Sequence, residues 1–288
     1  MLPFYGDADH FRLAVQSVLA QTDGHFRLVC VDDAFPSDDP RRWLESLKDP
    51  RLVYVRNDEN LGVARNFAHC LDLVEAPWFV MMGGDDIMHP TYIETVRSLA
   101  RDSACAVIQP GVVVIDADGH PVLPLADRLK ALIRPRSRDE VGELRGEALA
   151  RSLARGDWAY FPSLLWRTDA VRPHGFDQRY EIALDLALLF DLALDDQAML
   201  ISDATCFSYR RHSSSASSIT AVDGLRFAQE RELLEGYAER FARKGWRRAE
   251  RAARLRLLPR LNAGSVAAGL ALRGLFSDAW RVLRFCIR

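Results

Sequence analysis

The chain has 288 residues, of which 49% are hydrophobic and 27% charged, with 38 lysines and arginines against 40 aspartates and glutamates. This near balance of charge argues against a dedicated nucleic-acid-binding protein, and the hydrophobic content excludes a long disordered chain. The five cysteines lie far apart and form no Cys-x-x-Cys pair, which argues against a disulfide framework or a zinc site. We find no signal-peptide pattern and no apolar run of about 18 residues, so we expect a globular protein of the reducing cytoplasm.

Strand and helix patterns alternate through the first third of the sequence. Helical spacing of apolar residues predicts helices at 11–21, 63–74 and 90–99. Apolar runs predict strands at 26–31, 51–55, 76–82, 104–108 and 111–115. These strands are continuously apolar, as strands buried on both faces are. The alternation predicts an α/β fold with a mostly parallel sheet and helices on both of its faces.

The second half of the chain changes character. A basic, proline-containing segment from 125 to 155 is interpreted as a surface excursion, and a strand at 161–166, a helix at 183–194 and a strand at 205–210 follow. Beyond Gly224 the pattern is helical and rich in Arg, Leu and Ala. We therefore expect a domain over residues 1–222 and a helical C-terminal extension over residues 223–288.

Acidic residues follow three of the predicted strands directly. Asp32 and Asp33 follow the first, residues 57–60 follow the second, and Asp85 and Asp86 follow the third after two glycines. If the strands are parallel, all three groups share the carboxyl edge of the sheet, where open α/β sheets bind ligands. Carboxylates brought together there predict a divalent cation, Mg²⁺ or Mn²⁺, whose remaining ligands are often phosphate oxygens.

The next helix adds positive charge to this predicted edge. Arg65 lies in its first turn, and the helix N-terminus contributes its dipole and free N–H groups. Together these features favour a metal–diphosphate ligand such as a nucleotide or a nucleotide-sugar. The alternatives are that Asp32 and Asp33 only cap a turn, that Gly83 and Gly84 form an ordinary turn, and that Arg65 is a solvated helix residue.

Other motifs narrow the class of protein. The segment Asp116–Gly119 is interpreted as a hairpin turn, because Asp-Gly between apolar runs is typical of one and the later Glu of a calcium loop is missing. The sequence has no Gly-x-Gly-x-x-Gly after a strand, no P-loop and no Gly-x-Ser-x-Gly. These absences argue against a dinucleotide dehydrogenase, a P-loop NTPase and an α/β-hydrolase.

The ordered set of motifs resembles family 2 glycosyltransferases of the GT-A fold. The pieces that carry the resemblance are Leu2-Pro3-Phe4-Tyr5, Ser17-Val18-Leu19-Ala20-Gln21-Thr22, Val31-Asp32-Asp33 with Asp38, Asn60-Leu61-Gly62-Val63-Ala64-Arg65-Asn66, Gly84-Asp85-Asp86-Ile87-Met88-His89-Pro90, Gly175-Phe176-Asp177 and Asp185. The resemblance covers about residues 1 to 212. Two motifs depart from the family pattern, since Gly83 replaces an Asp of the metal motif and Leu184 precedes Asp185 where Glu is common.

The resemblance implies a role for each matching residue. It places Pro3 and Tyr5 at the nucleotide base, Asp32 and Asp33 at the base and ribose, Arg65 at the diphosphate, Asp85 at the ribose and metal, Asp86 as the metal ligand and Asp185 as the catalytic base. Glu181, Asp177 and Asp191 are rival candidates for the base. A further alternative is that Asp185 is only a polar residue that the helix dipole stabilises.

The function that the resemblance implies is transfer of one sugar with inversion, from a UDP- or dTDP-linked donor to a hydroxyl group. The acceptor would be a glycan or a lipid-linked molecule of bacterial-type surface polysaccharide synthesis, and a divalent cation would be the cofactor. The motif Gln-x-x-Arg-Trp of processive synthases is absent. The alternative is a catalytically weak or inactive nucleotide-sugar-binding relative, which the short first strand and the thinned acidic motifs favour.

Three further features admit both a functional and a structural interpretation. The aromatic residues Trp158, Tyr160, Phe161 and Trp166 either stack on an acceptor sugar or belong to the core. The sequence Arg210-Arg211-His212 precedes a Ser-rich segment, 213–218, that we expect to close over the diphosphate. The basic amphipathic stretch Trp280, Arg281, Leu283, Arg284 and Phe285 either makes a peripheral contact with an anionic membrane or packs on the catalytic domain.

Overall fold

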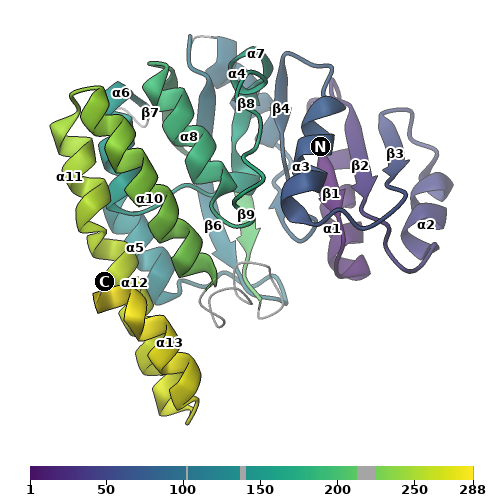
Figure 1. The fold of residues 1–288 in the computed structure, drawn as a ribbon. Helices are drawn as coiled ribbons and strands as arrows, with labels where there is room; N and C mark the ends of the chain where they lie inside the picture. Colours follow the sequence, from purple (N-terminus) through teal and green to yellow (C-terminus); the bar gives the residue numbers. More distant parts are fainter. Residues whose placement is uncertain (102, 137–140, 213–224, 288) are drawn as a thin grey trace.

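The computed structural model describes the chain except residues 102, 137–140, 213–224 and 288 (Figure 1). Its first sheet contains three parallel strands in the order β1 (Leu2–Phe4), β2 (Leu28–Asp32) and β3 (Leu52–Arg56). β4 (Trp78–Val80) lies beside β1, because the amino group of Met1 donates to Val80 O at 2.8 Å and Met82 N donates to Met1 O at 3.0 Å. β4 therefore connects this sheet to the second one.

The second sheet is mixed and has the strand order β4-β8-β6-β9-β5, with β7 also paired to β9. Its members are β5 (Ile87–Met88), β6 (Val107–Ile115), β7 (Val141–Arg145), β8 (Leu165–Arg167) and β9 (Ala198–Arg210). β6 and β9 are parallel, whereas β8 runs antiparallel to β4 and β6, and β5 and β7 run antiparallel to β9. The carboxyl ends of β6 and β9 thereby point to the same side as those of the first sheet (Figure 1).

Helices cover both faces of the sheets, as predicted. One face packs against α1 (Ala8–Leu19), α2 (Asp39–Leu47) and α4 (Tyr92–Arg101), and the opposite face packs against α3 (Val63–Asp72), α6 (Gly146–Arg155) and α8 (Leu184–Leu194). The remaining elements before the extension are α5 (Leu125–Ile133), η1 (Phe161–Ser163) and α7 (Thr168–Val171). Local signals explain these elements. For example, the side chain of Asp7 caps α1 by accepting from the N–H groups of Asp9 and His10.

Three sequence predictions need correction. The strand expected at 161–166 is a short 3-10 helix, η1, followed by the strand β8 from Leu165. The segment 125–155 is not a surface excursion, because α6 places Leu149, Ala150 and Leu153 in the core while its arginines face solvent. Its apolar residues share one helical face, a spacing that the surrounding basic residues obscured. The strands expected at 104–108 and 111–115 are one strand, β6, whose register shifts at Gly111. A Cβ at that glycine would lie 2.7 Å from Asp203 O, so the irregularity requires glycine.

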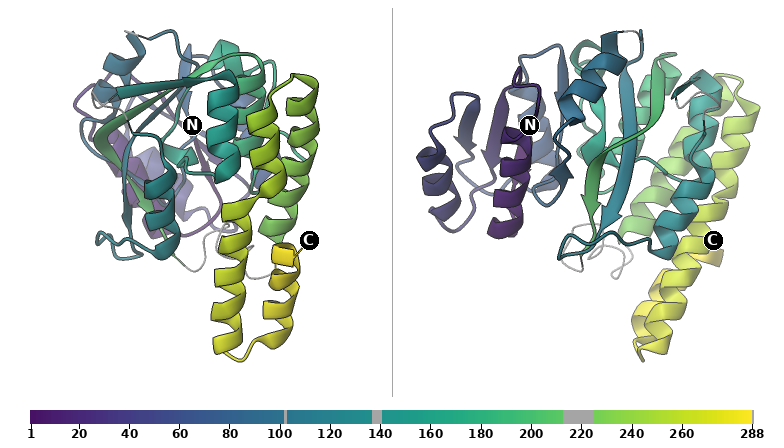
Figure 2. Two further views of the ribbon diagram at one scale, coloured as in Figure 1. Left: turned by 90° about the vertical axis from the view of Figure 1, so that its left-hand side faces the viewer. Right: turned by 180° about the vertical axis from the view of Figure 1, so that it is seen from behind.

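Four helices follow residue 224, namely α10 (Leu225–Arg243), α11 (Arg247–Leu255), α12 (Leu257–Leu272) and α13 (Phe276–Ile287). α10 and α11 pack against α6 and α8 through Tyr237, Phe241 and Ala249. α12 and α13 form a hairpin that projects away from the body of the molecule (Figures 1 and 2). Across the described parts of the chain, none of the helices combines the length and apolar character that crossing a membrane requires.

Candidate active site at the carboxyl edge

The carboxyl ends of the first three strands and the loop after β4 meet at one edge. Asp33 N donates to Phe4 O at 2.9 Å, and Asn57 N donates to Asp32 O at 2.8 Å, so the ends of β1, β2 and β3 are adjacent. The loop after β4 lies on the other side of β1, because a Cβ on Gly84 would lie 3.5 Å from Pro3 O. The three acidic groups that follow the strands therefore share one edge of the fold.

Asp32 is 1% exposed and holds the turn that follows β2. Its Oδ1 accepts from Phe35 N at 2.6 Å, and its Oδ2 accepts from Tyr54 Oη at 2.6 Å and from Arg56 Nη1 at 3.1 Å. Burial, together with the bond to Asp32, raises the pKa of Tyr54 to about 12, so this phenol remains a donor at neutral pH. The contacts of Asp32 are those of a turn-forming residue, and its contact with a nucleotide stays a prediction.

Asp33 organises the loop that leads into α3. Its carboxylate accepts from Asn57 Nδ2 at 2.7 Å, Leu61 N at 2.8 Å and Gly62 N at 3.0 Å. Gly62 has a φ of 76°, a conformation that favours glycine. The helix that follows presents Arg65 to solvent, 3.8 Å from Glu59, so the guanidinium is available to a ligand at this edge.

At the start of the edge, Pro3 is buried within β1, whereas Tyr5 is 56% exposed. The exposed ring of Tyr5 lies 6.1 Å from that of Phe35, centroid to centroid. This arrangement leaves an aromatic surface beside the buried acids. The roles predicted for Pro3 and Tyr5 at a nucleotide base stay predictions.

Asp85 and Asp86 direct carboxylate oxygens toward a common space above Gly83. A Cβ on Gly83 would lie 2.6 Å from Asp86 Oδ2 and 2.8 Å from Asp85 Oδ1. Asp86 is fully buried; its Oδ1 accepts from Arg210 N at 2.8 Å, and its Oδ2 has no hydrogen-bond partner among the described residues. Burial, and then the charge of Asp85, raise the pKa of Asp86 well above its ordinary value. A buried carboxylate of this kind requires a compensating positive charge to ionise.

His212 completes this cluster from the end of β9. Its Nε2 lies 2.8 Å from Asp85 Oδ2, and its ring lies 5.4 Å from that of His10. The sequence alone indicates only that His212 precedes the Ser-rich segment 213–218. The signal that identifies it is tertiary, because its partner Asp85 lies 127 residues earlier in the chain, and Arg210 N, two residues before it, donates to Asp86 Oδ1.

The residues of this cluster fit a divalent cation. The unpartnered Oδ2 of Asp86, the converging Oδ1 of Asp85 and the imidazole of His212 are oxygen and nitrogen donors that Mn²⁺ or Mg²⁺ accepts. A side chain at Gly83 would fill the space between the two carboxylates, because its Cβ would lie 2.6 Å from Asp86 Oδ2 and 2.8 Å from Asp85 Oδ1. A second group, Asp116, Asp118 and His120, lies in the predicted hairpin turn, where Asp116 Oδ1 accepts from Asp118 N at 3.0 Å and from His120 N at 2.9 Å.

A buried ion pair anchors the end of β9 beside the cluster. Arg211 donates from Nε and Nη2 to the two oxygens of Asp127, at 2.6 and 2.8 Å, and Tyr160 Oη donates to the same carboxylate at 3.0 Å. Asp127 comes from α5 and is 1% exposed. Because residues on either side of Arg211 contact Asp85 or Asp86, this ion pair fixes the strand end that presents them.

Asp185 lies in the first turn of α8 and is partly buried. Burial, with a smaller effect from the negative charge of Asp157, raises the pKa of Asp185 to about 7. The positive charge of Lys130 on α5 opposes this increase in the pKa of Asp185. A carboxylate that titrates near neutral pH is suited to act as a general base.

The rival bases have other partners. Asp177 accepts from Arg179 Nη2 at 2.7 Å, and Asp191 accepts from Arg240 Nη1 at 2.5 Å. Glu181 is exposed. Three of the aromatic candidates for sugar stacking belong to the core: Trp158 and Trp166 are fully buried, and Phe161 stacks on Phe67. The segment 213–218, which we expected to close over the site, lies outside the described residues.

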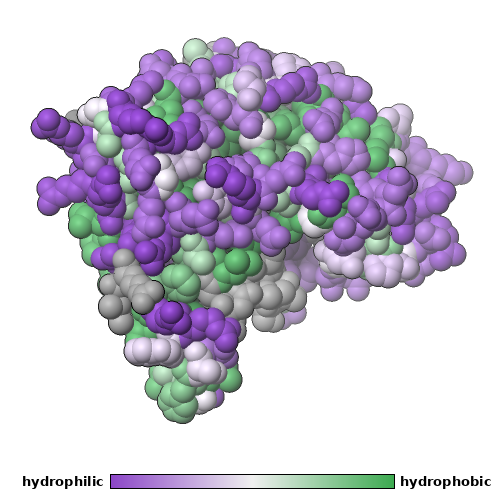
Figure 3. Space-filling view, in the orientation of Figure 1, coloured by the Kyte–Doolittle hydropathy of each residue, from purple (hydrophilic) through white to green (hydrophobic). Residues whose placement is uncertain are grey.

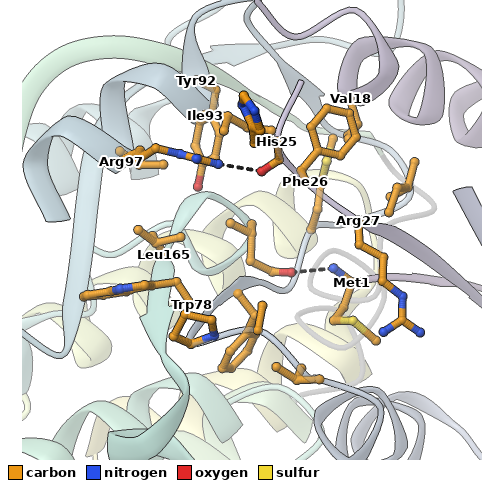
Figure 4. Close-up of a pocket in the computed structure, with 18 of the residues that line it drawn as sticks. Met1, Val18, His25, Phe26, Arg27, Trp78, Tyr92, Ile93, Arg97 and Leu165 are labelled. Atoms are coloured by element: carbon orange, nitrogen blue, oxygen red, sulfur yellow. Dashed lines mark hydrogen bonds between the residues drawn. The ribbon is translucent and has the colours of Figure 1, made fainter. Parts of the chain in front are cut away.

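Two of the hollows that described residues line differ in their position relative to the strands. One, of about 780 Å³, borders Asp127, Lys130 and Tyr160 on the candidate-site side. The other, of about 670 Å³, lies at the opposite, amino ends of β1, β2 and β4 and has a mainly apolar lining (Figure 4). Polar groups at its rim bond to protein partners: the amino group of Met1 bonds to Val80 O, and Arg97 bonds to His25 O.

Comparison with known proteins agrees with this geometry. The family model for glycosyl transferase family 2 matches residues 1–145. The chain belongs to this family. The four free cysteines that the structure describes, Cys30, Cys70, Cys105 and Cys206, are buried, as expected for small core residues of such a domain.

Individual relatives support the same assignment. The putative teichuronic acid biosynthesis glycosyltransferase TuaG of Bacillus subtilis is 29% identical over 124 residues, which are 42% of this chain and 48% of TuaG. The alignments span between 31% and 56% of the lengths of the curated relatives.

Solved structures share the fold. TarS 1–349 of S. aureus in complex with UDP superimposes with a TM-score of 0.60 at 14% identity, over 99% of this chain and 89% of that one. Mannosyltransferase PcManGT from Pyrobaculum calidifontis, in complex with GDP-Man and Mn²⁺, superimposes with a TM-score of 0.60 at 15% identity, over 99% of this chain and 84% of that one. The fold is therefore that of GT-A glycosyltransferases, as the sequence predicted.

Proposed function

We propose that this chain is a non-processive, inverting glycosyltransferase. It moves a sugar from a nucleotide-diphospho-sugar, UDP- or dTDP-linked, to a hydroxyl group of a glycan or lipid-linked acceptor in bacterial-type surface polysaccharide synthesis. Residues 1–222 form the catalytic unit and residues 223–288 a helical extension. The observation that carries the proposal is the pair of carboxylates above Gly83, one of them with a buried oxygen that lacks a partner among the described residues.

The donor occupies the carboxyl edge. Tyr5 and Pro3 contact the base, while Asp33, with Asp32 beside it, lies at the base and ribose and holds the loop that presents Arg65 to the diphosphate. Asp85, Asp86 and His212 hold the divalent cation, which when bound supplies positive charge to the leaving diphosphate. TarS has been solved with UDP and with UDP-GlcNAc, and PcManGT with GDP-Man and Mn²⁺, which supports a donor and cation of these classes.

The chemical step requires one proton acceptor. Asp185 takes the proton of the acceptor hydroxyl as its oxygen attacks the anomeric carbon of the sugar. The bond from that carbon to the diphosphate oxygen breaks, and the electron pair leaves with the nucleoside diphosphate. Attack from the face opposite the leaving group inverts the configuration. The pKa of about 7 makes Asp185 a competent base near neutral pH.

A panel of nucleotide-sugars tests this function. We expect one UDP- or dTDP-sugar to raise the melting temperature in the presence of Mn²⁺ more than in its absence, because a ligand that binds only the folded state stabilises it. The same donor should be slowly hydrolysed, with release of its nucleoside diphosphate. Stabilisation without any turnover would favour the inactive sugar-nucleotide-binding relative, and no response to any donor would contradict both functions.

A further inference from the structure

The hairpin of α12 and α13 has an unusual distribution of apolar residues. Its buried positions are mostly small: Ala263, Ala267, Leu270, Ala279 and Val282, which pack with Phe227 of α10. Its large apolar side chains face solvent around the turn between the helices, with exposed fractions of 89% for Leu272, 43% for Leu275, 71% for Phe276 and 61% for Trp280. We call these four residues the hairpin tip.

The structure divides the amphipathic stretch that the sequence suggested. Leu283 and Phe285 turn inward, and the Phe285 ring lies 6.5 Å from that of Phe227. Phe276 and Trp280, four residues apart, share the outward face of α13. Several large apolar side chains exposed together at the end of a projecting element mark an interaction site rather than a solvated helix. Figure 3 shows hydrophobic residues at the projecting end of the molecule.

The positive charge beside the hairpin tip favours an anionic partner. Residues 257–288 contain five arginines and one aspartate. Arg273 and Arg284 are exposed on the same hairpin, and Arg281 lies 3.3 Å from Asp278. Aromatic and leucine side chains next to arginines are typical of helices that lie in the interface of an anionic bilayer.

The hairpin extends toward the side of the molecule that carries the candidate site. The strands of the first sheet and β9 point their carboxyl ends toward the lower side of Figure 1, and the hairpin extends toward that same side. A surface that contacts the hairpin tip would therefore lie on the side of the molecule that carries Asp86 and His212.

We propose that the hairpin tip docks the protein on an anionic lipid bilayer. The apolar tip enters the headgroup region, and the arginines contact anionic headgroups. The docking itself depends only on the hairpin. Its consequence, that the candidate site faces an acceptor carried in the membrane, rests on the proposed function.

Vesicle flotation of the full chain tests the docking. We expect the protein to float with phosphatidylcholine vesicles that contain phosphatidylglycerol, and much less with phosphatidylcholine alone. The double variant Phe276→Ser/Trp280→Ser should reduce the bound fraction about tenfold, because it removes the two aromatic side chains from the tip. The matched control is Leu13→Ser/Leu132→Ser, which alters two exposed leucines on other helices (47% and 73% exposed) and should float like the wild type.

Three results would overturn the proposal: no flotation of the wild type, equal flotation of the tip variant, or a dimer in light scattering that the tip variant abolishes while no vesicles bind. Circular dichroism and the melting temperature of both variants establish that they fold. Hydrolysis of the donor without lipid distinguishes the two proposals. If the tip variant hydrolyses the donor but no longer floats, both proposals are supported. If the wild type floats but does not hydrolyse any donor, docking is supported and the transferase function is contradicted.

Discussion

The two ends of the parallel strands differ in a way that locates the chemistry. At the amino ends, a cavity of about 670 Å³ has an apolar lining, and its polar rim groups are bonded within the protein. At the carboxyl ends, the buried Asp86 keeps one oxygen without a partner among the described residues, and its pKa is raised. A cavity stabilised by ordinary contacts needs no ligand, whereas a buried carboxylate of this kind does. A buried carboxyl oxygen without a partner among the described residues therefore marks the functional end better than empty volume does.

The largest expected effect at the carboxyl end comes from Asp185→Asn. Loss of a general base should lower kcat by between about 10² and 10⁴, with little change in donor affinity. Single-turnover transfer and donor titration measure the two quantities. Asp191→Asn is the matched control on the same helix, since it removes the partner of Arg240 and should leave the chemical step intact. Normal transfer by Asp185→Asn would remove Asp185 from the mechanism.

Asp86→Asn should lower kcat/KM by about 10² to 10³, because one electrostatic contact to the developing charge is lost. Its dependence on Mn²⁺ concentration should shift to higher concentrations in the same assay. Asp116→Asn, in the other acidic group, is the control and should leave the Mn²⁺ dependence unchanged. If Asp116→Asn shifted the Mn²⁺ dependence and Asp86→Asn did not, the cation would bind in the turn at residues 116–119 instead.

The pH dependence of kcat/KM tests the role of Asp185 with the same donor and acceptor. Because the base must be deprotonated and its pKa is about 7, kcat/KM should fall about tenfold per pH unit below that value. The raised pKa also predicts that the stability contributed by the protonated group is present below the unfolded pKa and is lost as the pH rises through about 7. Asp185→Asn should therefore gain melting temperature relative to the wild type between about pH 4 and 7, and the difference should stay constant at higher pH. A difference in melting temperature between variant and wild type that does not change with pH would contradict the raised pKa of Asp185.

Asp127→Ala tests how the end of β9 is held. Removing one partner of a buried ion pair costs about 3–5 kcal/mol of unfolding free energy, which denaturant titration measures. If the pair also positions His212, the Mn²⁺ concentration for half-maximal rate should rise about tenfold. Asp127→Glu is expected to restore part of that affinity. A loss of stability with unchanged Mn²⁺ dependence would limit Asp127 to a structural role.

The smallest effect is expected at the amino ends. Ala100→Leu, which adds apolar volume to the cavity, should raise the free energy of unfolding by about 0.5–2 kcal/mol. The value of kcat/KM should change by less than about twofold. A large loss of activity from this substitution would mean that the amino ends also take part in the function, and the comparison between the two ends would fail.

The sequence located most of the elements that form the carboxyl edge, because a buried strand followed by Asp or Gly is a local signal. It also placed Asp33 beside residues of the next loop, and the bonds from Asn57 and Gly62 confirm that neighbourhood. It failed for α6, whose burial depends on α8 and α11 packing over it, and for His212, whose partner lies more than a hundred residues away.

The sequence by itself therefore determined the fold class, the family and the acids at the strand ends, since these follow from periodicity and short motifs. Only the tertiary structure decided which acid is satisfied and which is not. Asp32 and Asp33 accept hydrogen bonds from the next strand and the loop that follows it, whereas Asp86 accepts its hydrogen bond from β9, far away in the sequence. The tertiary structure likewise turned Phe285 inward and left Trp280 exposed, because burial depends on which helices pack together.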